Sequence, residues 1–260
     1  MQMDFRKVIY KLRNNLIPPH RFALYAQILL SAKTAGYNIL TLQDFRELSC
    51  DPPIPFLILR HDIDSDAVAA LLFAEIEQQH RCQASYFFRR STWNQKVIDT
   101  LNHQGHELGY HFEEMTDFAK RHHLKTKAEV IPHKQEIQRI FASQLAALRH
   151  TSGLELSSMA AHGDFAWKTL DLGNRFFLKD SAFRAAQDIS YEAYDEALVA
   201  AYGIHVSDKP YPEGFYPHHP LDLIAERTSF LLLTHPRWWH SNPLGNFASD
   251  IWVNIQKVLW

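Results

Sequence analysis

The stretch from Phe56 to Asp64 constrains the fold of this chain more than any other. Residues 56–59 form an unbroken apolar run just after three closely spaced prolines, and the chain then becomes abruptly polar over residues 60–64. Such a run is typical of a short strand that is buried on both faces, as in the parallel sheets of α/β proteins. We therefore predict an α/β fold in which this strand is central.

Asp62 and Asp64 lie at the carboxyl end of that strand. Because side chains alternate along a strand, both carboxylates face the same side, at the end where parallel α/β folds carry their chemistry. Two neighbouring carboxylates repel each other, and a bound cation or a shared proton would remove this cost. The alternative is that a carboxylate caps the next helix, and we assign that role to Asp66. Asp62 and Asp64 remain candidate site residues.

Composition limits the classes of partner. With 260 residues and 46% hydrophobic content, the chain can bury the core of one large domain. A net charge of −2 without a long basic block disfavours nucleic acid or an anionic membrane as a partner. Two cysteines are too few for a disulfide framework, and no apolar run approaches the ~20 residues of a membrane span. Since the first residues lack a continuous apolar signal region, we predict a cytoplasmic protein.

Predicted strands and helices alternate along the chain. We predict strands over residues 84–88, 106–111, 157–161, 198–202 and 230–235. We predict helices over residues 21–35 and 66–79, before Gly105, over much of 116–149, and after Asn242. We expect the last of these helices to pack its apolar stripe back on the barrel. This alternation indicates right-handed βαβ units and a parallel sheet or barrel. We treat residues 1–50 as a helical lead-in packed on the barrel and 51–260 as the barrel itself, within a single domain overall.

A histidine ends the third of these strands. Glu107, Gly109 and His111 share one face of the strand, and His111 is the last of them, at the same level as the two aspartates. A lone strand-end histidine is usually structural, but this coincidence makes His111 a candidate metal ligand. His106 lies on the opposite face, and we interpret it as structural.

Together these motifs resemble the polysaccharide deacetylase family, or carbohydrate esterase family 4. The motifs are RHDID at 60–64, ASYFF at 84–88 and GHELGYH at 105–111. The resemblance implies a distorted, incomplete (β/α) barrel of roughly seven strands. It also implies a metal-dependent enzyme in which Asp62 is the general base, Asp64 a metal ligand and His111 the first histidine ligand.

The family's next ligand, a histidine four residues later, is replaced here by Met115. A thioether is a poor ligand for a hard or borderline divalent ion, so another group must complete the set. Glu114 could do so if the chain turns helical after the strand. We favour His162, which follows a predicted strand, and we also place Asp164 at the site. Glu113 and Glu114 are otherwise expected to be solvated.

A second part of the resemblance lies near the end of the chain. Leu233-Thr234-His235 matches the family's Leu-x-His motif, which supplies the general acid that protonates the leaving amine. An imidazole suits this role because its pKa lies near neutrality. We expect further substrate contacts from four residues: Arg60, Asp164, Asp208 and Arg237.

The resemblance covers roughly residues 55–240. It implies a hydrolase that removes an N-acyl group, such as acetyl, from a sugar in polysaccharide or glycan biosynthesis. Its expected cofactor is a divalent metal, with Zn²⁺ favoured, and its expected partner is an N-acetylated sugar or oligosaccharide. One alternative is a catalytically inactive glycan-binding protein with the same fold. Another is a metal-dependent phosphoesterase, which predicts more basic residues near the site.

Overall fold

The strand β2 (Phe56–Ile63) lies at the centre of the sheet, and all of its residues are buried. The structure is a computed structural model that describes residues 20–48, 52, 55–210 and 213–260. Along its length β2 pairs in parallel with β3 (Ser85–Phe88), β9 (Phe230–Thr234) and, over its first residues, β1 (Asn38–Leu40). The prediction of a central, doubly buried strand is confirmed.

The sheet has nine strands within the described residues, and most of its pairings are parallel. The other strands are β4 (Glu107–Phe112), β5 (Ser158–Ala161), β6 (Tyr191–Glu192), β7 (Ile204–Asp208) and β8 (Phe215–Tyr216). Their order is β6-β5-β4-β3-β2-β9-β7-β8, with β1 beside β2, and only β7 and β8 are antiparallel. The predicted α/β class and parallel sheet are therefore confirmed. Closure into a barrel is not shown, because no pairing joins β6 and β8 in this part of the chain.

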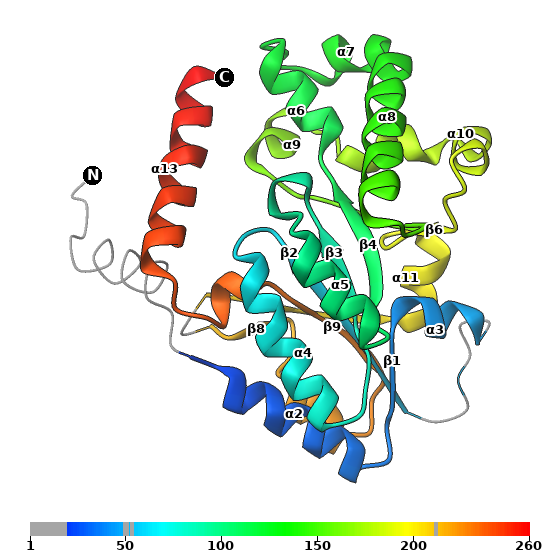
Figure 1. Cartoon of the computed structure of the whole chain (residues 1–260), viewed down its shortest axis with the longest axis vertical. Coiled ribbons are helices and arrows are strands. Elements are labelled where there is room, and N and C mark those ends of the chain that lie inside the picture. Colours follow the sequence, from blue (N-terminus) through cyan, green and yellow to red (C-terminus); the bar gives the residue numbers. More distant parts are fainter. Residues whose placement is uncertain (1–19, 49–51, 53–54, 211–212) are drawn as a thin grey trace.

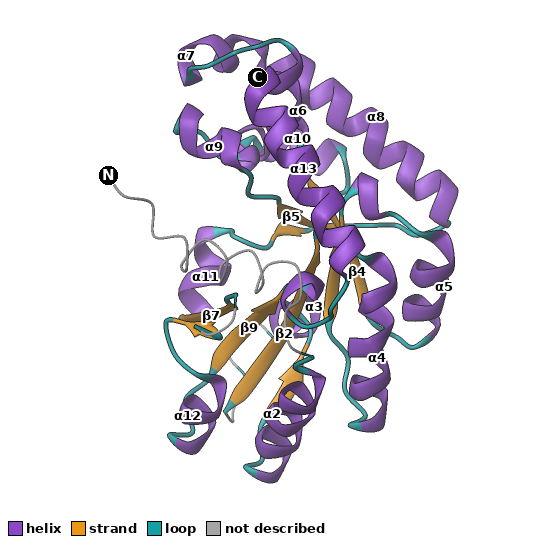
Figure 2. Ribbon diagram, turned by 90° about the vertical axis from the view of Figure 1, so that its left-hand side faces the viewer, coloured by secondary structure: helices purple, strands orange, loops and turns teal. Residues whose placement is uncertain are grey.

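Helices cover the outside of this sheet (Figures 1 and 2). Five of them follow one another in contact: α12 (Pro220–Ala225), α2 (Phe22–Thr34), α4 (Ala70–Gln79), α5 (Gln95–His103) and α8 (Lys134–Ser152). The others are α3 (Leu42–Glu47), α6 (Glu114–Arg121), α7 (Lys127–Val130), α9 (Phe165–Leu170), α10 (Ser181–Ala186), α11 (Glu196–Tyr202) and α13 (Pro243–Leu259). Short 3₁₀ turns are η1 (Ala67–Ala69), η2 (Arg90–Thr92), η3 (Ile131–His133), η4 (Asn174–Lys179) and η5 (Pro236–Trp238).

The alternation of side chains along β2 separates two apolar cores. Leu57 and Leu59 belong to the core beneath the outer helices, whereas Ile58 belongs to a core on the other face. This inner core joins residues of β2, β3, β5, β6 and β9, so the sheet curves around it. Arg60 and Asp62 continue the inner face, as the strand period requires.

The outer face of β2 is fixed by a buried polar network. The Glu77 carboxylate of α4 accepts hydrogen bonds from the hydroxyls of Tyr25 and Tyr86, each at 2.5 Å, and lies 2.7 Å from His61 Nε2. His61 Nδ1 lies 2.6 Å from the Thr234 hydroxyl of β9. Burial alone would raise the pKa of Glu77, but His61 outweighs burial and holds that pKa below its usual range. The network joins α2, α4, β3 and β9 to β2 directly behind the candidate site residues.

The predicted strand at 198–202 is wrong, because these residues belong to the helix α11. Its buried residues are Leu198 and Tyr202, which are four positions apart and so lie on one face of a helix. Gly203 follows with a positive φ of 73° and ends the helix. A short apolar run of this kind is ambiguous between strand and helix.

The predicted capping role of Asp66 is also wrong. Asp66 has a left-handed backbone conformation, with φ of 50°, and its side chain makes no capping hydrogen bond to the following turn. Its carboxylate instead contacts His240 Nδ1 at 3.0 Å and accepts a hydrogen bond of 2.9 Å from the Asn242 amide. Asp66 therefore ties the loop after β2 to the segment that leads into α13.

The helix α13 is present, but the prediction that its apolar stripe packs back on the barrel is wrong. Phe247, Ile251 and Val258 on this stripe are 54%, 42% and 85% exposed, respectively. Polar contacts of Asn242, Asp250 and Trp260 hold the helix in place. None of the helices between residue 20 and residue 260, in the ranges described, is long and apolar enough to cross a membrane.

The predicted lead-in is described only in part, since residues 1–19 and 49–51 lie outside the described residues. Residues 20–48 contribute α2, β1 and α3, and β1 belongs to the same sheet as β2. The predicted boundary at residue 50 therefore remains a prediction, as does the cytoplasmic location.

Candidate metal centre and active site

Five strands bring the predicted site residues to one edge of the sheet. Asp62 and Asp64 come from β2, and a single residue comes from each of four other strands: His111 from β4, His162 from the end of β5, Asp208 from β7 and His235 from the end of β9. These strands are parallel neighbours or next neighbours, so their carboxyl ends meet. The sequence predicted that several strand ends would converge, and the structure places them together.

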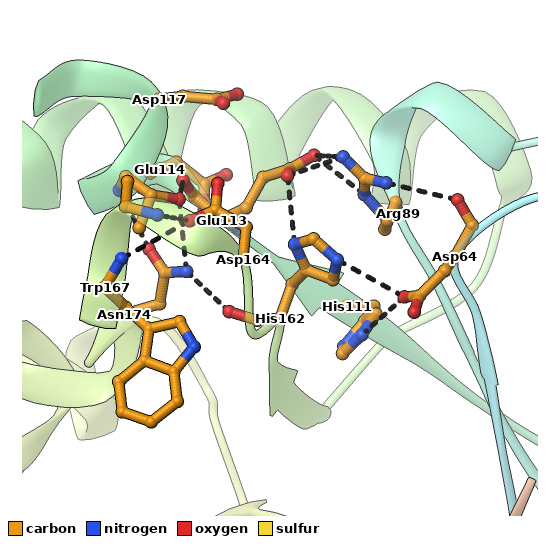
Figure 3. A network of polar contacts seen from close by, with 12 residues as sticks. Asp64, Arg89, His111, Glu113, Glu114, Asp117, His162, Asp164, Trp167 and Asn174 are labelled. Atoms are coloured by element: carbon orange, nitrogen blue, oxygen red, sulfur yellow. Dashed lines mark hydrogen bonds and ion pairs between the residues drawn. The ribbon is translucent and has the colours of Figure 1, made fainter. Parts of the chain in front are cut away.

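Asp64, His111 and His162 form a compact cluster (Figure 3). His111 Nε2 and His162 Nε2 lie 3.1 Å and 3.5 Å from Asp64 Oδ1. One ligand atom from each of the three residues lies within 4.8 Å of the other two. The three residues predicted as metal ligands therefore face a common point.

Two observations show that this cluster suits a divalent cation. Asp64 Oδ1 is buried, yet it has no hydrogen bond of normal geometry within the described residues. His111 Nδ1 contacts the Ala160 carbonyl at 2.9 Å, which turns its Nε2 toward Asp64. A histidine that binds a metal through one ring nitrogen typically donates a hydrogen bond from the other ring nitrogen in this way. One carboxylate and two imidazoles form the donor set of catalytic zinc sites that keep an open position.

Met115 and Glu114 do not belong to the cluster. Met115 is fully buried in the core that contains the α8 residues. Glu114 is also buried, and its carboxylate accepts hydrogen bonds from the Tyr110 hydroxyl at 2.5 Å and from the Glu113 backbone N–H at 3.1 Å. Burial raises the pKa of Glu114 to about 7, despite the hydrogen bond from Tyr110. Of the residues considered for the third position, His162 is the one that lies with Asp64 and His111.

The prediction that Glu113 and Glu114 are solvated is wrong, because both are buried. Glu113 pairs with the Arg89 guanidinium at 2.6 Å, and its Oε2 lies 3.2 Å from His162 Nδ1. It is thus a group behind His162 that the sequence analysis missed. Its position directly after the strand that carries His111 was the available signal, and we discounted it as part of a polar loop.

Asp62 is oriented by Arg60 of the same strand. The Arg60 Nε and Nη2 atoms donate to Asp62 Oδ1 and Oδ2, both at 2.8 Å. Burial would raise the pKa of Asp62, but Arg60 and then His111 outweigh it and hold that pKa below its usual range. Asp62 Oδ2 lies 3.6 Å from His111 Nε2. A fixed, ionised carboxylate therefore lies beside the cluster of Asp64, His111 and His162.

His235 also lies beside the cluster, with its Nε2 4.0 Å from Asp64 Oδ2. Its Nδ1 contacts Asp208 Oδ1 at 2.7 Å, while the His235 backbone N–H and the Trp239 indole N–H both donate to Asp208 Oδ2. Burial would lower the pKa of His235, but Asp208 outweighs burial and raises that pKa to about 9. The Asp208 carboxylate thus favours the protonated form of the imidazole.

The four predicted substrate contacts differ in position. Arg60 is fully buried beneath Asp62, and Asp208 is buried behind His235. Asp164 caps α9 through the Ala166 and Trp167 backbone N–H groups, and it pairs with Lys120 at 2.7 Å. Arg237 pairs with Asp250 of α13 at 2.7 Å. Whether any of them touches a substrate remains a prediction.

Comparisons with known proteins give a limited result. No protein-family profile matches this chain, and no curated protein matches it in sequence. Among solved structures, the chain is similar to a mutant of a CE4 family pseudoenzyme with restored enzymatic activity, at 12% identity and a TM-score of 0.40. The match covers 80% of this chain and 65% of that chain, so it spans less than two thirds of that protein. A match at this level transfers no activity or residue role to this chain.

Proposed function

We propose that this protein is a metal-dependent hydrolase that removes an N-acyl group, such as acetyl, from an amino sugar of a polysaccharide or glycan. The observation that carries the proposal is the cluster of Asp64, His111 and His162, with ligand atoms within 4.8 Å of one another. The Arg60–Asp62 pair lies beside it, with Asp62 3.6 Å from His111, and so does the Asp208–His235 pair, with His235 4.0 Å from Asp64. A base, a metal site and an acid are the groups that hydrolysis of an unreactive amide needs.

The metal centre and Asp62 would act on the attacking water. Asp64, His111 and His162 would hold a divalent ion, and zinc fits this donor set best; when bound, it would lower the pKa of a water and polarise an acyl carbonyl. Asp62 is an ionised carboxylate 3.6 Å from His111 Nε2 that is not itself a proposed ligand, and it would accept the proton that the water loses. Arg60 keeps Asp62 in one orientation and in its ionised form.

His235 would act on the leaving group. An amine leaves an amide carbon readily only when its nitrogen is protonated, so a proton donor must stand on the side away from the base. His235 carries that proton at neutral pH because Asp208 raises its pKa to about 9. Trp239 and the His235 backbone N–H bind the other oxygen of Asp208 and so fix the pair.

The charges around the centre favour amide over phosphoester hydrolysis. Arg60, Arg89 and Arg237 all form ion pairs with carboxylates, those of Asp62, Glu113 and Asp250. A phosphoesterase needs cations that are free to neutralise a phosphate. These three arginines are not free in this way. Lys168 and Lys257, which line the same cavity as Asp64, are unpaired, but they contact the rings of Trp167 and Phe165 rather than the candidate ligands.

We expect the Asp208→Asn variant to lose activity at alkaline pH first. Removing the carboxylate leaves burial as the main influence on His235, so the pKa of its imidazole falls. Because the protonated form is the active one, the basic limb of the kcat/KM profile should move to lower pH by at least about one unit. A pH–rate series for Asp208→Asn beside Asp222→Asn, an exposed carboxylate on α12, tests this. An unchanged basic limb would contradict the role of His235.

The proposed activity is tested by supplying N-acetylated chito-oligosaccharides and measuring free acetate. The expected result is acetate release that chelator treatment stops and added Zn²⁺ restores. Parallel incubation with generic phosphoesters should release no phosphate. Phosphate release without acetate release would establish the phosphoesterase instead. Release of neither product by metal-loaded protein would indicate a protein that binds glycans without cleaving them.

A further inference from the structure

A groove runs between α13 and the rest of the protein, and it starts at the candidate metal centre. Two cavities, of about 520 Å³ and 680 Å³, lie along it. Asp64 and His162 line the first cavity, while Arg90 and Arg121 line the second. Arg89, Lys120, Trp252 and Gln256 line both, so the cavities adjoin. We name the two adjoining cavities the α13 groove.

The wall formed by α13 is fixed at both of its ends. At its beginning, the amide of the preceding Asn242 donates to Asp66 at 2.9 Å, and in its middle Asp250 pairs with Arg237 of η5 at 2.7 Å. At its far end, the Trp260 indole N–H donates to the carbonyls of Ala119 and Leu124, at 3.2 Å and 3.1 Å. Figure 1 shows α13 standing beside the main body with its far end near α6. These contacts hold the helix over the groove, with Asp250, Gln256 and Lys257 among its lining residues, and they leave the apolar side chains of Ile251, Ile255 and Val258 exposed.

The groove carries an excess of unpaired positive charge. Apart from Asp64 at the metal centre, its carboxylates are all paired: Glu113 with Arg89, Asp117 and Asp164 with Lys120, and Asp250 with Arg237. Four cations of the lining have no carboxylate within ion-pair distance among the described residues: Arg90, Arg121, Lys168 and Lys257. Because low-dielectric walls focus the field inside a cleft, four such cations attract an anionic ligand along its length.

Aromatic rings accompany these cations. The groove is lined by Trp238, Trp252 and Trp260. The side chain of Trp252 is 60% exposed, so a ligand in the groove can reach it. Indole rings offer flat apolar faces with a polar edge, which suits contact with a sugar ring. Lys257 lies over the ring of Phe165, which also borders the groove. Flat faces alternating with cations suit a chain of sugars that carries acidic groups.

We propose that the α13 groove binds an acidic glycan, with a carboxylate-bearing sugar at Arg90 and Arg121 while a neighbouring N-acylated sugar reaches the metal centre. This proposal rests on the proposed function for which group is hydrolysed, but the binding itself is independent of catalysis. It adds the charge of the substrate, which the cluster of Asp64, His111 and His162 does not specify.

The test is calorimetric titration with two hexasaccharides that both carry N-acetyl groups. Hyaluronan hexasaccharide alternates N-acetylglucosamine with glucuronate, and chitin hexasaccharide is its uncharged counterpart. The acidic chain is expected to bind about tenfold more tightly at low salt, with the difference shrinking as salt screens the charges. The Arg90→Gln/Arg121→Gln variant should lose about five- to tenfold of hyaluronan affinity and little chitin affinity. Arg139→Gln/Lys96→Gln, which removes two exposed cations outside the groove, is the matched control.

Three outcomes would overturn the proposal. The first is that hyaluronan binds no more tightly than chitin, which includes the case in which neither chain binds. The second is that the control variant loses as much hyaluronan affinity as the Arg90→Gln/Arg121→Gln variant. The third is that N-acetylglucosamine 1-phosphate binds as tightly as hyaluronan, which would assign the groove to a single phosphorylated sugar. Acetate release from the chitin chain without preferential hyaluronan binding refutes the groove proposal alone. Preferential hyaluronan binding without acetate release from either chain refutes only the proposed hydrolysis.

Discussion

Replacing Asp62 with asparagine is expected to slow N-deacetylation by about 10²- to 10⁴-fold, the usual contribution of a positioned general base. Asparagine keeps the shape of the side chain and can still accept a hydrogen bond from Arg60, but it cannot take a proton from water. Since Asp62 is not a ligand in this account, zinc content should not change. Acetate release and metal content, measured on the same preparation, separate the two roles.

The control for this prediction is Asp99→Asn, an exposed carboxylate on α5 that lies outside the site. It should leave both readings unchanged. A fall of less than about tenfold in Asp62→Asn would contradict the assignment of Asp62 as base. Loss of metal along with activity would instead make Asp62 a ligand.

The second large effect is expected in His235→Gln, and it should depend on the leaving group. Hydrolysis of an N-acetyl sugar needs a proton for the departing amine, so its rate should fall by about 10²- to 10⁴-fold. 4-Nitrophenyl acetate has a leaving group that departs without protonation, so its hydrolysis should fall far less. The ratio of the two rates therefore reports the acid role directly.

An equal fall for both substrates would contradict that role, because it would mean that His235 acts on the attack or on the structure of the site. His240→Gln is a suitable control, since His240 contacts Asp66 at the base of α13 and none of the candidate site residues. Its two rates should change little and in parallel.

The parts of the fold that could be predicted are those with a strong local period. The β2 run and the parity of Glu107, Gly109 and His111 follow from the alternation of side chains. Residues 198–202 could not be resolved in this way, because five apolar residues fit a strand or a helix and only the buried pair four residues apart decides. For α13, the helical period was correct, but the period does not say which face meets the protein. The orientation of α13 is decided by the polar contacts of Asn242, Asp250 and Trp260.

The candidate site was predictable up to the third ligand. Asp62, Asp64, His111 and His235 each follow or end a recognisable strand. The sequence favours His162 over Glu114 as the third candidate ligand but does not fix it, because the position of His162 depends on pairing between β4 and β5 across a long separation. In the structure His111 is paired with Ala160, and the His162 backbone N–H donates to the Phe112 carbonyl at 2.8 Å. That register brings His162 beside His111, with ring centroids 5.1 Å apart.

Elemental analysis of the purified protein tests the central claim most directly, that Asp64, His111 and His162 hold a catalytic metal. The comparison is between the wild type, His162→Gln and Glu114→Gln, all incubated with Zn²⁺ and then dialysed. The account predicts about one zinc per chain in the wild type and in Glu114→Gln, and little in His162→Gln. Zinc that persists in His162→Gln and disappears in Glu114→Gln, or a wild type that retains none, would contradict it.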